Sequence, residues 1–420
     1  MKKLSAIIIG YGMRARVYTD YMLKNPDKFE VVAVADPSEA ARAYAKERHN
    51  LPNDKLYSSW TDLCAESKMA DFAIISTQDN LHYAPAMACI KKGYDILLEK
   101  PIAPTAKECK DIYKAAEANG VKVLVCHVLR FTKFWGKLRD IIKSGEIGTV
   151  MSMIHMENVG NEHQSHSFVR GKWRNTKESS PMILAKSCHD TDILQWLIDK
   201  KCRKVQSFGS LSYFTPENRP NGAPDRCLDG CPYLDTCCYN PIKLYIEDKS
   251  WDRRMAVTGL ANPSDEDVMK ALREGNFGRC VYACDNDAVD HQVVNMEFED
   301  GCTVSFTMCA FNKLGRHIRI FGTKGEIVAD MEGKISLYSF ADKKTRTIKY
   351  TGPGQELASG HGGGDSGIME DAYEYFNGGT PSESVSGIEN SYLNHLTCFA
   401  AEESRFTDTV VKLEEFSEKI

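Results

Sequence analysis

The chain has 420 residues, of which 42% are hydrophobic, 10% aromatic and 26% charged. This is the composition of a soluble globular protein, and it excludes a fibrous or disordered chain. Its 53 Lys and Arg against 58 Asp and Glu give a net charge of −5, so we expect neither nucleic acid nor an anionic membrane surface as a partner. The length predicts more than one domain.

The apolar runs and the cysteines of the sequence indicate the cellular location that we expect. The longest apolar runs are a handful of residues, whereas a membrane helix needs about 20, so we expect no membrane span. The 15 cysteines are an odd number scattered along the chain. That pattern favours reduced thiols and a cytoplasmic location.

In the first part of the chain, short β-branched runs alternate with helical stretches. The predicted strands are Leu4–Ile9, Val31–Ala35, Phe72–Ser76, Ile96–Leu98 and Val121–Val125. Such alternation is typical of βαβ units, so we predict an α/β domain with a doubly wound parallel sheet over residues 1–126.

The first predicted strand runs into a glycine-rich turn that opens a helix. Residues Gly10 to Ala15 fit G-x-G-x-x-A, with Met13 and Arg14 in the first helical turn. Gly10 permits the tight turn, and Gly12 lets a pyrophosphate approach the backbone. This context predicts a Rossmann domain with these residues at a dinucleotide.

Asp36 ends the second predicted strand, where a carboxylate accepts hydrogen bonds from the adenosine ribose. The same carboxylate repels a 2′-phosphate, which favours NAD over NADP. Arg14 and Arg42 keep NADP open as an alternative.

Two polar segments follow the third and fourth predicted strands. The first contains Thr77 and His82, and the second is Glu99-Lys100-Pro101. Because ligands bind at the carboxyl ends of such strands, we place Thr77, His82 and Glu99 at the cofactor and Lys100 at a reacting hydroxyl.

Residues 127–420 have a different pattern. Predicted strands at Val150–Met156, Val293–Phe298, Cys302–Phe311, His317–Phe321 and Thr345–Tyr350 are linked by hairpin turns. We predict an α+β domain with a large, mainly antiparallel open sheet. Helices should cover one face, and a second subunit the other, in a homo-oligomer such as a dimer or tetramer.

Two loops of this second domain are candidates for ligand contact. Between His163 and Asn175 the chain is polar and aromatic, and we expect Arg170 and Trp173 at the substrate and Arg174 at a cofactor phosphate. The glycine-rich segment Gly360–Asp365 should be a loop that can fold over substrate.

A cysteine-rich insertion spans about residues 215–285. Cys227, Cys231, Cys237 and Cys280 could enclose a structural zinc ion. Free thiols that pack the insertion are an equal alternative, and an iron–sulfur cluster is a third.

Taken together, these motifs resemble the Gfo/Idh/MocA family, the group of glucose-fructose oxidoreductase and inositol dehydrogenase. The matching residues lie along nearly the whole chain: Gly10, Gly12, Ala15, Asp36, Thr77, His82, Glu99, Lys100, Pro101, Trp173, Arg174, His189, Asp190, Asp192, Gly322, Thr323, Lys324 and Gly325. The resemblance implies a nicotinamide-dependent oxidoreductase of a sugar or cyclitol, with Lys100 and a helical histidine beside the nicotinamide.

By this resemblance His189 is the general base and Lys100 polarises the hydroxyl. Apolar spacing over Ile183–Leu197 predicts a helix that carries Lys186 and His189 on one face, with Asp190 as a further substrate contact. Family members commonly have an acid four residues before this histidine, and this chain has Ala185 there. Lys186 is therefore a candidate substrate contact.

The sequence thus predicts an NAD-dependent dehydrogenase that moves a hydride from a secondary hydroxyl of a small carbohydrate, cyclitol or glycoside. A redox-neutral glycosidase or lyase on the same fold is the alternative. A dinucleotide sensor without turnover is a third, which the presence of both Lys100 and His189 disfavours.

Overall fold

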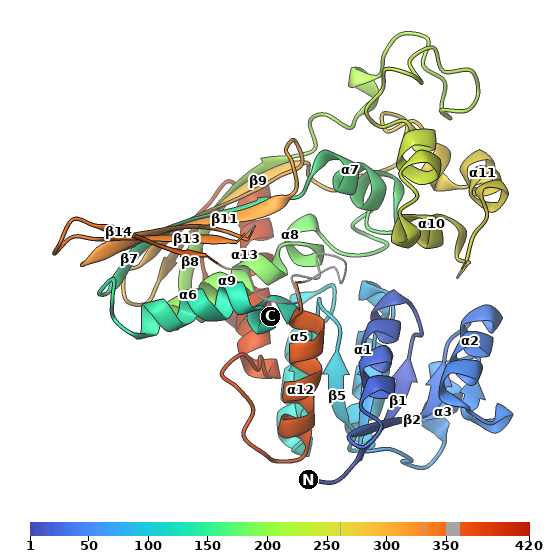
Figure 1. Ribbon diagram of the computed structural model, residues 1–420, viewed down its shortest axis with the longest axis horizontal. Helices are drawn as coiled ribbons and strands as arrows, with labels where there is room; N and C mark the ends of the chain where they lie inside the picture. The colour runs from blue at the N-terminus through green and yellow to red at the C-terminus, as the bar shows by residue number, and fades with distance from the viewer. Residues whose placement is uncertain (261, 332, 350–361) are drawn as a thin grey trace.

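A six-stranded parallel sheet forms the first layer of this computed structural model, which describes residues 1–260, 262–331, 333–349 and 362–420. The strands lie in the order β3-β2-β1-β4-β5-β6 (Figure 1). Their bounds are β1 (Leu4–Ile9), β2 (Phe29–Ala35), β3 (Leu56–Tyr57), β4 (Phe72–Ile75), β5 (Asp95–Leu98) and β6 (Val123–Val125). The predicted doubly wound sheet is confirmed, with β3 as a short edge strand that we did not predict.

Helices cover both faces of this sheet. One apolar cluster joins it to α3 (Trp60–Ala65), α4 (Tyr83–Lys91) and α5 (Ala106–Asn119). The other joins it to α1 (Met13–Lys24), α2 (Glu39–His49) and α12 (Gly364–Phe376). The helix α12 belongs to the C-terminal part of the sequence but packs on the first sheet. The domain boundary that we predicted at residue 126 therefore divides the sequence, and the packed first domain also includes α12. The predicted loop Gly360–Asp365 lies partly outside the described residues, and its last two residues begin α12.

The second sheet has nine strands in the order β14-β13-β12-β11-β7-β10-β9-β8-β15. Among the described strands of this second sheet, only β7 and β10 pair in parallel. The predicted, mainly antiparallel sheet is therefore confirmed. The strand bounds are β7 (Val150–Asn158), β8 (Cys202–Ser210), β9 (His291–Phe298), β10 (Thr303–Cys309), β11 (Gly315–Gly322), β12 (Gly325–Asp330), β13 (Lys334–Ser339), β14 (Thr345–Lys349) and β15 (Val411–Lys412).

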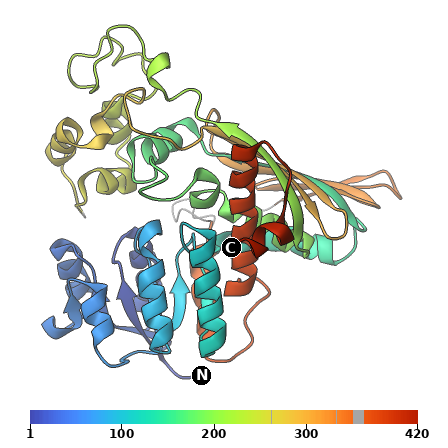
Figure 2. The same cartoon turned by 180° about the vertical axis from the view of Figure 1, so that it is seen from behind.

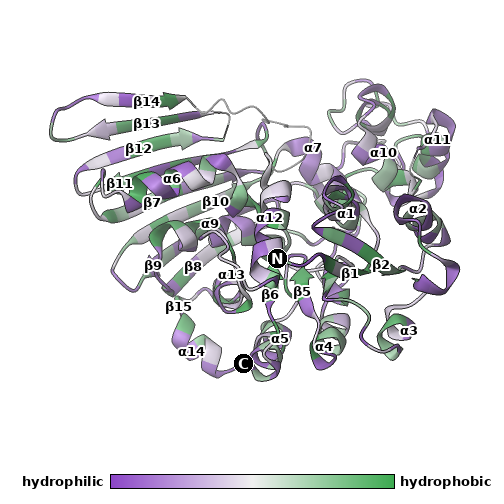
Figure 3. Cartoon of the chain, turned by 60° about the horizontal axis from the view of Figure 1, so that its bottom comes forward, coloured by the Kyte–Doolittle hydropathy of each residue, from purple (hydrophilic) through white to green (hydrophobic). Residues whose placement is uncertain are grey.

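One face of the second sheet is covered by helices (Figure 3). They are α6 (Lys133–Lys143), α9 (Cys188–Ile198) and α13 (Ile388–Thr407), whose apolar residues share a core with the inward side chains of the strands. The short helix α14 (Leu413–Glu418) follows β15. No described helix is long and apolar enough to cross a membrane.

Between β8 and β9 the chain forms the predicted insertion, which lies above α1 and α2 in Figures 1 and 2. It contains α10 (Trp251–Thr258), α11 (Asp265–Glu274) and short turns, and it has apolar clusters of its own. Arg16 of α1 reaches Met255 of α10, with 3.5 Å between Nη1 and Sδ.

The predicted helix over Ile183–Leu197 is broken in two. The structure has α8 (Met182–Ala185) and then α9, with Lys186 and Ser187 between them. Lys186 therefore does not share a continuous helical face with His189, because the chain leaves the helical path at Ser187, which has φ −90° and ψ 3°. This corrects the predicted geometry.

Candidate functional site

The loop after β1 fits a dinucleotide phosphate. Gly10 has φ +85°, and a Cβ on it would lie 2.9 Å from the backbone of Ser76 and Thr77. Gly12 is the N-cap of α1, and no side chain caps that helix. The first-turn N–H groups of α1 are therefore available to a pyrophosphate. Met13, 40% exposed, lies beside them.

Asp36 lies at the end of β2, beside this loop. Its Oδ2 accepts the Tyr11 N–H at 2.7 Å, and its Oδ1 accepts the Ser38 N–H at 2.8 Å. Each oxygen keeps a lone pair for a ribose hydroxyl. Arg42 donates to the carbonyl oxygens of Asp36 and Pro37 at 2.7 and 3.0 Å. The loop thus presents the carboxylate that NAD recognition needs.

Arg14 and Glu99 form an ion pair inside the protein. Arg14 Nε donates to Glu99 Oε1 at 2.5 Å, and its Nη2 donates to Asp365 Oδ1 at 2.7 Å. Burial opposes ionisation of Glu99, but Arg14 and the Tyr18 hydroxyl outweigh it and lower its pKa. Arg14 and Glu99 bind each other and tie α1, β5 and α12 together, and their predicted cofactor contacts stay predictions.

The segment after β4 is held to the segment after β5. Both ring nitrogens of the buried His82 face carbonyl oxygens, that of Pro101 at 2.7 Å and that of Thr77 at 3.2 Å. His82 therefore holds these two segments together, and its predicted cofactor contact stays a prediction. Thr77 is partly exposed, and its hydroxyl donates to the Leu81 carbonyl at 3.0 Å.

Trp173 connects the two domains at the same edge. Its Nε1 lies 3.2 Å from both carboxylate oxygens of Asp79, which follows β4. Ser180 Oγ donates to the same carboxylate at 2.8 Å. Trp173 thus ties the second domain to the loop after β4, through a partner, Asp79, that we did not predict, and its predicted substrate contact stays a prediction.

Lys100 and the α8–α9 region meet between the domains. Lys100 Nζ donates to the Ala185 carbonyl at 2.6 Å. His189, in the first turn of α9, is 5% exposed, and its ring contacts His127 with 6.0 Å between centroids. The structure therefore brings the two predicted catalytic residues to neighbouring elements.

Lys186 belongs to a cluster of charged side chains that also contains Glu157, Asp190 and Arg316. Its Nζ lies 3.3 Å from Glu157 Oε1 at the end of β7. Arg316 of β11 binds Glu157 and Asp190, in each case with Nε 2.7 Å from a carboxylate oxygen. Burial lowers the pKa of Lys186, Glu157 opposes that shift, and Arg316 and Lys100 add to it. Lys186 is therefore an ammonium group that loses its proton more readily than a solvated lysine.

Asp190 is fully buried and lies between Arg316 and His155, whose Nε2 is 2.8 Å from Oδ1. Burial opposes its ionisation, but Arg316 and His155 hold its pKa well below the usual range. This corrects the prediction that Asp190 contacts substrate, because both of its oxygens are used within the protein.

Arg174 lies at the base of the insertion. Its Nε and Nη2 donate to the two oxygens of Asp285 at 3.1 and 3.2 Å. This pairing lowers the pKa of Asp285 to about 2. Arg174 thus fastens this loop to the insertion, and its predicted contact with a cofactor phosphate stays a prediction.

Arg170 packs inside the protein, and its predicted substrate contact stays a prediction. It is fully buried, and it donates to the carbonyl oxygens of Arg279 at 2.8 Å and Tyr239 at 2.9 Å. Its Nη2 also lies 3.6 Å from Cys227 Sγ. Arg170 thus fastens the turn η4 (Ser165–Arg170) to the insertion.

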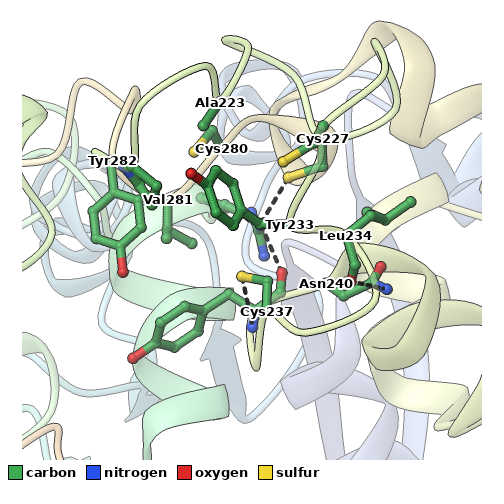
Figure 4. A pocket seen from close by; sticks show the side chains of 13 residues that line it. Ala223, Cys227, Tyr233, Leu234, Cys237, Asn240, Cys280, Val281 and Tyr282 are labelled. Carbon is green, nitrogen blue, oxygen red and sulfur yellow. Dashed lines mark hydrogen bonds between the residues drawn. The ribbon is translucent and has the colours of Figure 1, made fainter. Parts of the chain in front are cut away.

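Four cysteines of the insertion and Arg170 line one pocket (Figure 4). The four predicted ligands are all among its lining residues: Cys227, Cys231, Cys237 and Cys280. All four cysteines are free thiols in the structure, and burial raises the pKa of Cys227 to about 11. Within the described ranges no group of three or more His, Cys, Asp or Glu side chains is arranged to hold a metal ion, so the zinc prediction has no support.

Sequence reasoning missed Glu157 and Arg316, which face each other in the β7–β11 register. No local motif marks them, since only the strand pairing brings them together. It also missed His127, which comes two residues after a buried strand and was open to the same argument as Lys100.

Comparison with known proteins agrees with this arrangement. Residues 4–127 match a family described as the oxidoreductase family with an NAD-binding Rossmann fold, and residues 139–413 match its C-terminal alpha/beta domain. The oxidoreductase YteT of Bacillus subtilis is 24% identical over 388 residues, covering 87% of this chain and 88% of that protein.

Two further similarities bear on chemistry and fold. The 2,7-anhydro-N-acetylneuraminate hydratase of Escherichia coli is 29% identical over 202 residues, 48% of this chain and 51% of that protein. The solved structure of a levoglucosan dehydrogenase with NADH and L-sorbose has a TM-score of 0.69 at 20% identity, covering 98% of this chain and 99% of that one. From its glycine loop to its second sheet, the chain belongs to the Gfo/Idh/MocA oxidoreductase family, with an NAD-binding Rossmann domain.

Proposed function

We propose that the protein oxidises a secondary hydroxyl of a sugar, cyclitol or glycoside with NAD, using Lys100 and His189. The observation that supports this proposal is that Lys100, which follows β5, binds the Ala185 carbonyl close to α9, the helix that carries His189. Asp36 after β2, and Asp79 after β4 with its partner Trp173, lie at the same edge of the sheet. The levoglucosan dehydrogenase, which has the same fold, was solved with NADH and a sugar.

His189 and Lys100 have different roles in the proposed reaction. His189 takes the proton of the hydroxyl, and the Lys100 ammonium stabilises the oxygen as negative charge develops on it. Bound NAD⁺ supplies the hydride acceptor. Asp79, through Trp173 and Ser180, holds the second domain against the loop after β4 and so fixes the distance between substrate and cofactor.

A redox-neutral reaction is the second candidate, because one relative is named a hydratase. Such a reaction needs a further group to move a proton after the first oxidation. Lys186, with its lowered pKa and its Glu157 partner, is the group that could do so.

The test uses Lys100→Met and His189→Ala. Each should lower kcat at least about 100-fold while the Kd for NAD changes less than about threefold, because neither side chain holds the dinucleotide. Sugars, cyclitols and glycosides are screened by NADH absorbance and, in parallel, by chromatography of the carbohydrate. Normal turnover in both variants would refute the proposed site.

The two candidate reactions give different products. A dehydrogenase forms one NADH for each substrate consumed, whereas the redox-neutral reaction forms altered carbohydrate with no net NADH. Lys186→Met separates them further. It should stop the redox-neutral turnover and leave single-turnover NADH formation in place.

A further inference from the structure

Lys186 carries an ammonium group that the described part of the chain does not fully use. Its side chain is 19% exposed, and its Nζ lies 3.3 Å from Glu157 Oε1. That ion pair is its one contact among the described side chains, and no described atom accepts a hydrogen bond from it. An ammonium group has three N–H donors, so donors remain for a ligand.

The carboxylates around Lys186 are buried and paired inside the protein. The side chains of Glu157 and Asp190 are 1% and 0% exposed, and Arg316 Nε lies 2.7 Å from an oxygen of each. The Arg316 side chain itself is 13% exposed. A molecule that enters between the domains therefore meets the cations of this cluster, with the carboxylates behind them.

Lys100 adds a second ammonium group beside Lys186. Its Nζ donates to the carbonyl of Ala185, the residue directly before Lys186, at 2.6 Å. Like charges this close repel each other, and an anion between them relieves the repulsion.

The positive potential extends to α7 (Asn161–Gln164), which follows β7. Burial lowers the pKa of His163 on this helix well below its usual value, and the charges of Lys186 and Lys100 are among those that lower it further. His163 is therefore a neutral ring, and it supplies no negative charge to balance the two ammonium groups.

We propose that the substrate is a sugar acid whose carboxylate binds the Lys186 ammonium while Lys100 contacts the hydroxyl to be oxidised. The inference rests on the proposed function, because it names the class of carbohydrate that the proposed dehydrogenase takes. Uronates and aldonates have this chemistry, since each carries one carboxylate and several secondary hydroxyls.

A single negative charge suits this place better than no charge or two. A neutral sugar would forgo the charge-assisted hydrogen bond that Lys186 offers. A phosphate dianion would be repelled by Glu157 and Asp190, which lie behind the cations. Because Lys186 is largely withdrawn from solvent, its attraction for a carboxylate is screened less than that of a surface lysine.

The test measures the Kd of matched probes on the NAD-bound protein by calorimetry. D-Glucuronate, D-galacturonate and D-gluconate are each compared with the corresponding carboxamide, which has nearly the same shape and no charge. At least one acid should bind about tenfold more tightly than its carboxamide. If no acid reaches that difference, the proposal is overturned. Glucose 6-phosphate tests the other anion, and tighter binding of it than of every acid also overturns the proposal.

Variants of Lys186 test the contact itself. Lys186→Met should weaken the preferred acid about tenfold and its carboxamide less than about twofold. Lys186→Arg keeps the charge and should keep the preference. Lys172→Met removes an exposed lysine of a neighbouring loop, with the same change in net charge, and should leave both Kd values unchanged. If Lys186→Met does not fold, Lys186→Gln takes its place. An undiminished preference in the folded variant overturns the assignment to Lys186.

Binding needs no turnover, so this inference and the proposed function can fail separately. If Lys186 selects an acid while Lys100→Met and His189→Ala turn over normally, the proposed function fails and the carboxylate site stands. If neutral sugars are oxidised through Lys100 and His189, and no acid binds more tightly than its carboxamide, the proposed function stands and the carboxylate site is refuted.

Discussion

At the scale of single residues, Asp36 should decide which cofactor binds. NAD should bind at least about tenfold more tightly than NADP, because the carboxylate would face the added phosphate. Asp36→Ala should reduce this difference in affinity, and it should also weaken NAD binding, since the variant loses the Tyr11 and Ser38 hydrogen bonds that shape the loop. Calorimetric titration with each cofactor measures the two affinities.

Arg42 provides the control for that experiment. It lies beside Asp36 and is the cation nearest in sequence that could receive a 2′-phosphate. Arg42→Ala should lower NADP affinity more than NAD affinity if the phosphate reaches it. Equal affinities for the two cofactors in the unaltered protein would contradict the assignment to Asp36.

The sequence motifs predicted where residues lie in the fold better than they predicted which groups the side chains contact. Gly10, Asp36 and Lys100 lie where the motifs place them, because each is tied to a strand end that the alternating pattern reveals. Arg170 and Arg174 lie in a polar loop that looks solvated in sequence. The structure packs the insertion against them, and their guanidinium groups bind it. Sequence alone does not show which long-range surface meets a loop.

At the scale of elements, hydrophobic periodicity predicted the parallel strands closely because they are buried on both faces. It missed β8, β12 and β13, in which apolar residues alternate with polar ones between short turns. It also joined α8 and α9 into one helix, since Met182 to Leu197 is apolar enough to support either form. The break falls at Lys186 and Ser187, where Lys186 also pairs with Glu157, a tertiary contact that periodicity does not show.

Arg170 should be the main attachment of the insertion to η4. Arg170→Met keeps the stem but leaves the Arg279 and Tyr239 carbonyls without donors, which should cost about 2–4 kcal/mol of unfolding free energy. Urea unfolding measures the loss, and limited proteolysis should cut within residues 211–290. Arg219→Met in the same insertion removes a pair with the exposed Asp225 and should cost less than about 1 kcal/mol. Equal effects would argue against a special role for Arg170.

At the scale of the whole molecule, the uncovered face of the second sheet should join two copies of the chain. Val328, Arg319 and Ile154 form one row across β12, β11 and β7, and Met156 and Phe208 belong to the next row. The apolar members are between 38% and 53% exposed. Such a surface on a broad sheet is typical of a subunit interface.

Ile154→Glu tests this interface. A carboxylate in the centre of the face should convert an oligomer to a monomer in sedimentation velocity, because it would be buried without a partner. Leu260→Glu, on the insertion and 43% exposed, should leave the assembly unchanged. A monomer in the unaltered protein at micromolar concentration would contradict the prediction.

The buried histidines should make the whole fold sensitive to mild acid. Burial is the largest cause that lowers the pKa of His127, His163 and His395, the last to about 3. Each unfolded ring takes a proton near pH 6.5, and the folded ring does not, so the unfolded state binds more protons as pH falls. Stability is complete above pH 6.5 and declines below it. At pH 5 each such ring should cost about 2 kcal/mol. Urea unfolding between pH 8 and pH 5 measures the slope, and His395→Gln should reduce it by one ring's share. A stability that stays level across this range would mean that these rings are protonated inside the folded protein.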